Sequence, residues 1–214
     1  MMLNFDKGTE LPSKYLGAEK KTAILYEGER YMLKLPHPFD NKTVRPFEGA
    51  ASYKNNQYSE YIGSSIFRAC GIEAQEAFLG HYTDDTGKRK IVVGCKDFTQ
   101  DGGALYEFSA LKNTVKHDEV LSENIEDVYA IINNSHFIKD KQAVIDGFWD
   151  MFVVDALIGN RDRHLGNWGM LEKDGEFRLA PVYDCGSSLN AWLEDDEMQK
   201  LLTTASPQLK KQLI

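Results

Sequence analysis

The sequence feature that most constrains the fold is a long apolar helix that leads directly into a loop rich in oxygen-bearing side chains. Residues 140–159 combine helical periodicity with large apolar groups and end at a Gly-Asn pair, which predicts a buried helix. Beyond it, Asp162 is followed by Asn167, and a short hairpin with an Asp-Gly turn then leads to Asp184. Carboxylate and amide oxygens orient an attacking hydroxyl and hold magnesium against phosphates, so this order indicates phosphoryl transfer from ATP.

The spacing of these residues matches two elements of protein kinases. The kinase catalytic loop has the form H-R-D-x-x-x-x-N, and residues 160–167 have that form with Asn160 in place of His. The D-F-G element is matched by residues 184–186, with Cys185 in place of Phe. A single D-x-x-x-x-N pattern is a weak signal, because it also occurs in ordinary surface loops. The loop, the hairpin and the D-x-G element in this order, after a buried helix, are much more specific.

The first half of the chain supplies candidates for the remaining kinase groups in the expected order. Residues 22–35 predict two strands, with Lys34 on the face opposite the leucines, and residues 57–70 predict a helix that carries Glu60. In kinases a strand lysine reaches the phosphates, and a carboxylate on a helix holds that lysine. Alone, Lys34 would be interpreted as a solvated strand lysine and Glu60 as one of many surface glutamates. Their functional interpretation depends on the whole ordered series.

Together these patterns predict an α+β fold with two lobes, similar to that of protein kinases. Residues 1–99 are expected to form a nucleotide-binding N-lobe of antiparallel sheet plus one helix, with a further strand pair at 76–82 and 90–98. The sequence changes character after Phe98, where Gln100-Asp101-Gly102-Gly103 is typical of a linker. Residues 100–214 are expected to form a mainly helical C-lobe that carries the catalytic loop and the D-x-G element.

Several segments resemble the HipA family of bacterial Ser/Thr kinases, the toxins of toxin–antitoxin modules, and in particular its compact, stand-alone members of the CtkA type. The resemblance extends from about residue 13 to residue 190. It is carried by GAEKKTAIL (17–25), YMLKLP (31–36), SEYIGSSIFRACGI (59–72), VGCKDF (93–98), DALIGNRDRHLGNW (155–168) and FRLAPVYDCGSSL (177–189). The helical lobe of this family normally continues well past the D-x-G element, so the C-lobe is expected to be shortened here.

The resemblance implies a role for each catalytic candidate. Asp162 would accept the proton of the attacking hydroxyl, and Asn167 and Asp184 would be the Mg²⁺ ligands. His164 would lie beside the phosphates, and Lys34 would bind them.

The resemblance also implies how ATP would be held. The loop at 17–21 would cover the phosphates, because successive backbone N–H groups in such loops bind anions. Lys96 and Phe98 would offer backbone groups to adenine. The nucleotide-binding residues expected on this basis are Gly17, Ala18, Lys20, Lys21, Lys34, Glu60, Lys96 and Phe98.

Three functions are compatible with these residues. The first is an ATP- and Mg²⁺-dependent protein Ser/Thr kinase, which the HipA resemblance favours, with a small helix-turn-helix antitoxin as a partner. The second is a lipid kinase, because residues 162–167 also resemble the D-R-H-x-x-N loop of phosphatidylinositol kinases. The third is a catalytically weak nucleotide-binding module that acts through a partner. The presence of Lys34, Asp162, Asn167 and Asp184 argues against a catalytically inactive site.

Composition limits the partners. The 214 residues carry a formal net charge of -8, which argues against direct binding to nucleic acid or to an anionic membrane surface. The first residues lack the cationic and apolar regions of a secretory signal, and no apolar run is long enough to span a bilayer. Three cysteines lie far apart with no metal-binding spacing, which is typical of a reduced, cytoplasmic protein. The expected partners are ATP and a protein substrate, as the motifs indicate, and a small helix-turn-helix antitoxin, as the HipA resemblance implies, with no direct contact to nucleic acid or membrane.

Overall fold

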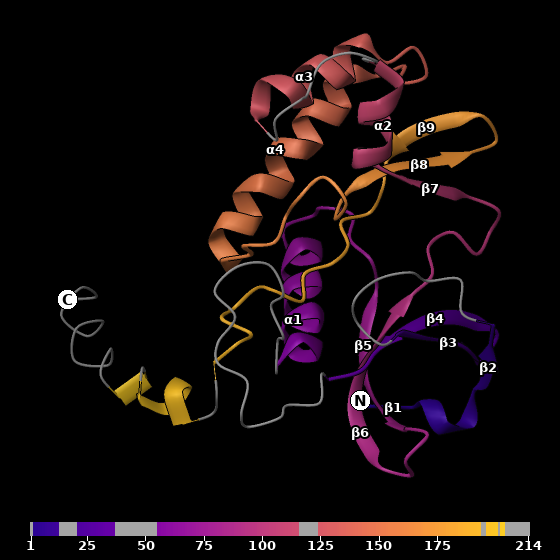
Figure 1. The fold of residues 1–214 in the computed structure, drawn as a ribbon, viewed down its shortest axis with the longest axis vertical. Coiled ribbons are helices and arrows are strands. Elements are labelled where there is room, and N and C mark those ends of the chain that lie inside the picture. Colours follow the sequence, from indigo (N-terminus) through magenta and orange to yellow (C-terminus); the bar gives the residue numbers. More distant parts are fainter. Residues whose placement is uncertain are drawn as a thin grey trace.

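Two sheets of different size divide the chain into a β-rich lobe and a mainly helical lobe (Figure 1). The computed structural model describes residues 2–12, 21–36, 55–115, 124–193, 196–200 and 202–203. Within these ranges the turn after residue 96 joins the two lobes. The predicted boundary after residue 99 lies in this turn and stays a prediction.

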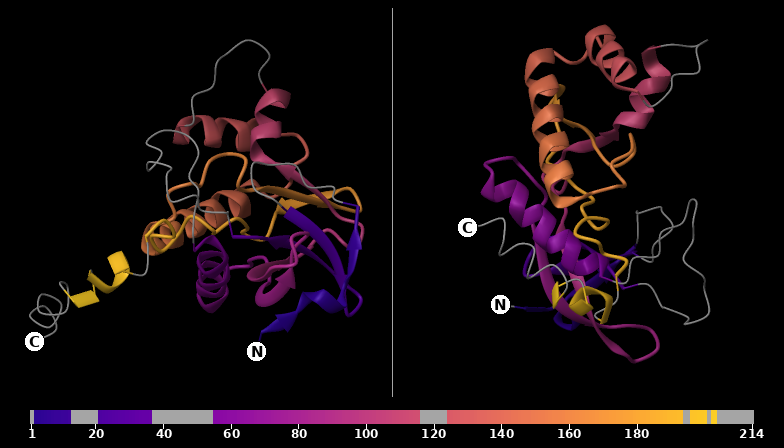
Figure 2. Two further views of the ribbon diagram at one scale, coloured as in Figure 1. Left: turned by 60° about the horizontal axis from the view of Figure 1, so that its bottom comes forward. Right: turned by 90° about the vertical axis from the view of Figure 1, so that its left-hand side faces the viewer.

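The β-rich lobe is a six-stranded sheet with one long helix, α1 (Asn56–Ala69), packed against β5 and β6 (Figure 2). The strands lie in the order β1-β5-β6-β4-β3-β2, and β1 pairs with β5 in parallel while the other neighbours are antiparallel. Their bounds are β1 (Leu3–Asn4), β2 (Thr9–Leu11), β3 (Lys21–Tyr26), β4 (Glu29–Lys34), β5 (Ala77–Thr83) and β6 (Arg89–Lys96). The strands and the helix that the sequence predicted in this half are all present.

The mainly helical lobe packs three described helices against a small antiparallel sheet with the order β7-β8-β9. The elements are β7 (Ala104–Glu107), α2 (Phe108–Val115), α3 (Ile125–Asn134), α4 (Lys141–Ile158), β8 (Gly169–Lys173) and β9 (Glu176–Leu179). Helix α4 is capped at its start by Asp140, whose side chain accepts a hydrogen bond from the Ala143 N–H, and at its end by Gly159 in the left-handed conformation. These two caps explain why the helix has the bounds that the sequence predicted.

Helix α4 buries one face only against the described elements, whereas its large apolar side chains predicted a buried helix. Its buried side chains are Val144, Met151, Val154, Asp155 and Ile158. Its exposed large apolar side chains are Trp149, Phe152, Val153 and Leu157. A helix that is apolar all round has no preferred face in its sequence, so only the packing of its neighbours decides which side is covered.

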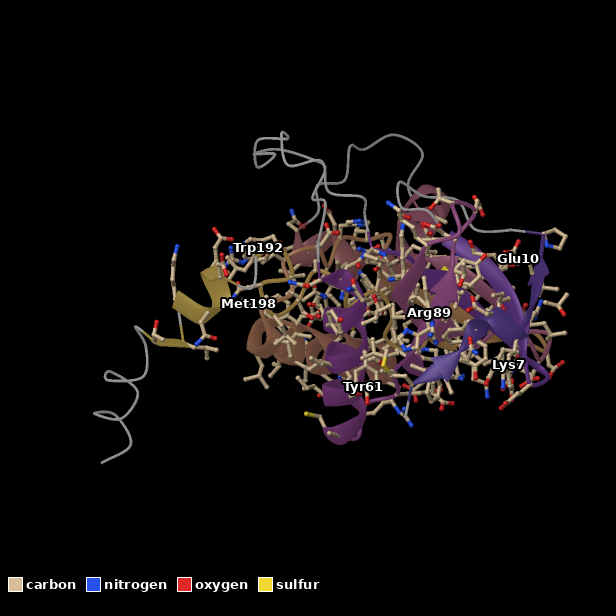
Figure 3. All side chains as sticks on the ribbon, turned by 90° about the horizontal axis from the view of Figure 1, so that it is seen from below. Lys7, Glu10, Tyr61, Arg89, Trp192 and Met198 are labelled. Carbon is tan, nitrogen blue, oxygen red and sulfur yellow. The ribbon has the colours of Figure 1, made fainter. Side chains whose placement is uncertain are left out.

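The chain after β9 returns to the β-rich lobe and runs along α1 (Figure 1). The Asn55 N–H donates to the Ala191 carbonyl at 3.0 Å, and the Asn55 side chain donates to the Leu193 carbonyl at 2.9 Å. Trp192, which stacks under the Arg161 guanidinium, lies with Met198 on the side of the molecule opposite Lys7 and Glu10 (Figure 3). The segment after the D-C-G element therefore holds the start of α1.

Phe5 packs over two glycines on the face of the sheet that lies opposite α1. The ring is fully buried, and a Cβ added to Gly80 or Gly94 would lie within 3.0 Å of it. Tyr26 and Tyr31 each contact Phe5 with ring centroids 5.5 Å apart. The two glycines thus leave the recess that this aromatic cluster needs.

We expect Gly94→Ala to destabilise the protein by about 1–3 kcal/mol, because the added methyl group overlaps the Phe5 ring. Urea unfolding of Gly94→Ala, Phe5→Leu and the double variant measures the coupling between the two sites. Since leucine vacates the space of the ring, the alanine should cost less in the Phe5→Leu background. An equal cost in both backgrounds would show that the overlap is not the cause.

Candidate active site

Lys34, at the end of β4, forms ion pairs with two carboxylates from other parts of the chain. Its Nζ lies 2.6 Å from Glu60 Oε2 on α1 and 2.7 Å from Asp184 Oδ1, which follows β9. Because strand residues alternate between faces, Lys34 points toward α1 while Leu33 and Leu35 pack with Phe5. The side chains of Lys34 and Glu60 are 3% and 1% exposed, so this pair is buried and not solvated.

The charges of these three groups stabilise one another. Burial by itself lowers the pKa of Lys34, but the negative charges of Asp184 and Glu60 outweigh it and raise this pKa well above its ordinary value. The Lys34 ammonium lowers the pKa of Asp184 to about 2, against the opposing effect of burial. Lys34 is therefore positively charged and Asp184 negatively charged at neutral pH.

Glu60 also holds the D-C-G element. Its second oxygen, Oε1, accepts a hydrogen bond from the Cys185 N–H at 3.1 Å. Gly63, almost one turn further along α1, lies so close that an added Cβ would be 2.8 Å from Cys185 Cβ. Asp184 has a φ of 60°, a left-handed conformation that costs a non-glycine residue roughly 1–2 kcal/mol. Contacts on both sides of Asp184 are therefore needed to maintain this backbone conformation.

Asp162 and Asn167 lie close together in the catalytic loop. Asn167 Nδ2 donates to the Asp162 carbonyl at 2.7 Å, and the Asn167 N–H donates to the His164 carbonyl at 2.9 Å. Burial raises the pKa of Asp162, His164 opposes this effect, and the negative charge of Asp184 adds to it. The two carboxylates are therefore near enough for their charges to interact.

Comparison with known proteins identifies the family. Residues 13–211 match the HipA-like C-terminal domain. The chain belongs to the HipA-like family. It is 41% identical over 199 residues to the serine/threonine-protein kinase CtkA of Helicobacter pylori (strain J99). That alignment covers 90% of this chain and 57% of CtkA, so this HipA-like chain spans somewhat more than half the length of its relative.

Solved structures share the fold. The crystal structure of the Helicobacter pylori proinflammatory kinase CtkA matches with a TM-score of 0.78 at 36% identity and covers 95% of this chain and 67% of that one. Hydra Fam20, solved with sugar, matches with a TM-score of 0.55 at 12% identity and covers 94% and 68%, a similarity of fold alone. These matches confirm the predicted kinase-like α+β fold, and the family match confirms the HipA resemblance.

Two further predicted residues are placed near this cluster, and three are not described. His164 Nδ1 accepts a hydrogen bond from the Gly166 N–H at 3.0 Å and so supports the turn of the catalytic loop. Lys21 on β3 is the register partner of Lys34 on β4. The predicted phosphate-loop residues Gly17, Ala18 and Lys20 lie outside the described residues.

Lys96 and Phe98, predicted to contact adenine, lie at the connection between the lobes. The Lys96 N–H donates to the Glu76 carbonyl at 2.8 Å, and the Lys96 carbonyl accepts from Gln75 Nε2 at 3.0 Å. The Phe98 ring lies 6.1 Å, centroid to centroid, from Tyr183, the residue before Asp184. Phe98 is thus connected to the D-C-G element, while the backbone of Lys96 is engaged within the N-lobe.

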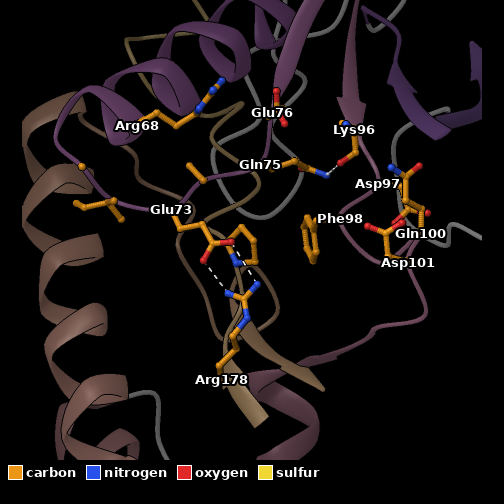
Figure 4. A pocket seen from close by; sticks show the side chains of 14 residues that line it. Arg68, Glu73, Gln75, Glu76, Lys96, Asp97, Phe98, Gln100, Asp101 and Arg178 are labelled. Atoms are coloured by element: carbon orange, nitrogen blue, oxygen red, sulfur yellow. Dashed lines mark hydrogen bonds and ion pairs between the residues drawn. The ribbon is translucent and has the colours of Figure 1, made fainter. Parts of the chain in front are cut away.

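A cavity of about 580 Å³ opens beside this connection (Figure 4). Its lining includes Lys96 and Phe98 together with the Glu73–Arg178 ion pair, whose closest N–O distance is 2.6 Å. The cluster around Lys34 does not line it. The cavity therefore lies outside the cluster of Lys34, Glu60 and Asp184.

The sequence patterns missed a buried ion pair beneath the catalytic loop. Asp155 on α4 accepts hydrogen bonds from Arg163 Nε at 2.7 Å and from Arg163 Nη2 at 3.1 Å. One signal did point to it, because Asp155 interrupts an apolar helix and a buried carboxylate needs a partner. The sequence offers both Arg161 and Arg163, which flank Asp162, and only the structure distinguishes them.

We expect the stabilising effect of the Asp184 carboxylate to be lost in acid. Its pKa in the folded protein is about 2, below the ordinary value of 3.8, so its contribution is complete above about pH 5 and is lost as the pH falls toward 2. Urea unfolding of the unmodified protein and of Asp184→Asn should therefore give a stability difference that is constant from pH 7 to 5 and shrinks below pH 5.

A suitable control removes an exposed carboxylate, Asp101→Asn, and should change the free energy of unfolding by less than about 0.5 kcal/mol. If the difference between the unmodified protein and Asp184→Asn is the same at pH 5 and at the lowest pH where both fold, the ion pair does not stabilise the fold as described.

Proposed function

We propose that this HipA-like chain transfers the γ-phosphoryl group of ATP to a serine or threonine of a protein. The observation that carries the proposal is the contact of Lys34 Nζ with both Glu60 and Asp184. In kinases the lysine that binds the phosphates is held by a glutamate on a helix and lies beside the aspartate that binds the metal. The CtkA relative, which is named a serine/threonine-protein kinase, supports the proposal. Since the chain spans only 57% of that relative, its own activity is an inference.

Asp162 is the proton acceptor in this proposal. The residue is exposed, whereas Asn167 beside it is buried, so the Asp162 carboxylate is accessible to a substrate hydroxyl. Burial of part of the side chain raises its pKa, which makes it a stronger base than an ordinary aspartate. Its roles are to orient the hydroxyl and to take its proton as the oxygen–phosphorus bond forms.

Asn167 and Asp184 are suited to hold Mg²⁺. Asn167 Nδ2 donates to the Asp162 carbonyl, which leaves Asn167 Oδ1 for another ligand, and Asp184 has Oδ2 in addition to the oxygen that contacts Lys34. Mg²⁺ in kinase sites is usually held by one or two protein oxygens together with phosphates and water, so this pair is sufficient. When bound, the ion would neutralise charge that develops on the phosphates.

The nucleotide is expected to lie between Lys34 and Phe98. Lys34, held by Glu60, binds the phosphates, and Gly17, Ala18, Lys20 and Lys21 cover them. Because the Lys96 N–H already donates to Glu76, we expect Phe98 to supply the backbone donor for adenine.

A helix-turn-helix antitoxin partner and a cytoplasmic location stay predictions from the sequence. Among the helices in the described part of the chain, none is long and apolar enough to cross a membrane.

The test is transfer of labelled phosphate from ATP with Mg²⁺ to proteins of a lysate, compared among the unmodified chain, Asp162→Asn and Asp150→Asn. Asp162→Asn should lower the rate by roughly 100-fold or more while ATP binding persists, because only the general base is removed. Asp150→Asn removes an exposed carboxylate of α4 and should leave the rate unchanged.

Three outcomes would reject parts of the proposal. Full activity of Asp162→Asn would remove Asp162 from the role of base. Phosphate transfer to phosphatidylinositol vesicles and not to protein would favour a lipid kinase. ATP binding without transfer by the unmodified chain would favour a nucleotide-binding module.

A further inference from the structure

Arg163 connects three segments of the candidate site through all its donors. Nε and Nη2 contact the Asp155 carboxylate at 2.7 and 3.1 Å, and Nη2 also lies 3.8 Å from Cys185 Sγ. Nη1 donates to the carbonyl oxygens of Asn167 and Tyr183. A guanidinium group has five N–H donors in one plane, and here they are directed to the end of α4, the catalytic loop and the D-C-G element.

The two carbonyls that Arg163 contacts lie in the backbone at, or directly before, a proposed metal ligand. One is the carbonyl of Asn167 itself, and the other belongs to the residue directly before Asp184. The residue directly after Asp184 is held by Glu60 through its N–H. Asp184 keeps its left-handed φ of 60° between these two contacts. Arg163 therefore holds the peptide that precedes Asp184 and also the backbone of Asn167, the other proposed ligand.

Asp155 fixes the guanidinium and extends the network to Asp162. The side chains of Arg163 and Asp155 are 9% and 6% exposed. Asp155 Oδ1 also accepts from Asn160 Nδ2 at 2.8 Å, and Asn160 Oδ1 accepts from the Asp162 N–H at 3.3 Å. A buried ion pair is often no more stabilising than apolar residues of the same size, so stability alone gives no reason for this pair.

We propose that Arg163 is a positioning residue that sets the separation of Asn167 and Asp184, and that Asp155 holds it in place for this purpose. The inference rests on the proposed function, since it takes Asn167 and Asp184 as the metal ligands. Residues that orient metal ligands through hydrogen bonds change metal affinity by roughly 10- to 100-fold when they are replaced. Metal binding in the presence of nucleotide should therefore depend on the shape of the guanidinium and not only on its charge.

The experiment compares Arg163→Lys with Arg89→Lys. Arg89 is the control, because it is an exposed arginine at the start of β6, at the other end of this strand from Lys96, and it does not line the cavity beside Phe98. The readout is Mn²⁺ binding, followed by electron paramagnetic resonance with a non-hydrolysable ATP analogue present. We expect Arg163→Lys to bind Mn²⁺ roughly 10-fold more weakly or worse and Arg89→Lys to bind it like the unmodified chain. The melting temperature without metal reports whether each variant folds.

A double variant keeps the inference testable if Arg163→Lys does not fold. Arg163→Met with Asp155→Leu replaces the pair by apolar side chains, so no buried charge is left alone and the fold is expected to persist. Weak Mn²⁺ binding by the folded double variant would support the positioning role. Mn²⁺ binding equal to that of the unmodified chain, in this variant or in folded Arg163→Lys, would overturn it.

The same measurement separates this inference from the proposed function. If the unmodified chain binds Mn²⁺ with the nucleotide but transfers no phosphate, the kinase proposal fails, and the comparison of Arg163→Lys with Arg89→Lys still decides the role of Arg163. If the unmodified chain binds no Mn²⁺ under these conditions, the metal site and the positioning role are both rejected.

Discussion

The arrangement of the site depends on one ammonium group that lies between two carboxylates. Lys34 comes from the sheet, Glu60 from helix α1 and Asp184 from the segment after β9, and no two of them are neighbours in the sequence. A buried charge that loses its partner is strongly destabilising, so the sheet, the helix and the D-C-G element have to meet in the one arrangement that pairs all three groups. The geometry that suits phosphate binding is therefore also a condition for the fold.

Helix α1 is held by the helical lobe at both ends, which fixes the place of Glu60. Past the end of the helix, the Gln75 N–H donates to the Val182 carbonyl and the Val182 N–H donates to the Glu73 carbonyl, both at 2.8 Å. At its start, Asn55 donates to the chain that follows the D-C-G element. The position of Glu60 therefore depends on the helical lobe as much as on the sheet that α1 covers. In this HipA-like chain the lysine–glutamate pair and the D-C-G element form one connected unit.

A second buried pair, Asp155 with Arg163, acts on the other side of the same site. Lys34 and Glu60 contact the side chain and the backbone around Asp184, whereas Arg163 contacts the backbone carbonyls of Asn167 and Tyr183. Asp184 is reached by both, through its carboxylate by Lys34 and through the preceding peptide by Arg163. This double support is consistent with the unfavourable backbone conformation of Asp184, which needs fixed neighbours to persist.

The sequence by itself determined the kinds of elements and their order, and it marked Asp162, Asn167 and Asp184 as candidates for the site, because these follow from local periodicity and from spacing along one short segment. It also gave Lys34 and Glu60 in the order that kinases have, but without the other motifs neither residue could be distinguished from an exposed one. Only the tertiary structure decided that both are buried and paired, that Arg163 and not Arg161 pairs with Asp155, and that one face of α4 is left uncovered by the described elements. The physical reason is that these outcomes depend on contacts between distant segments and on backbone carbonyls, which every residue carries and no sequence pattern marks.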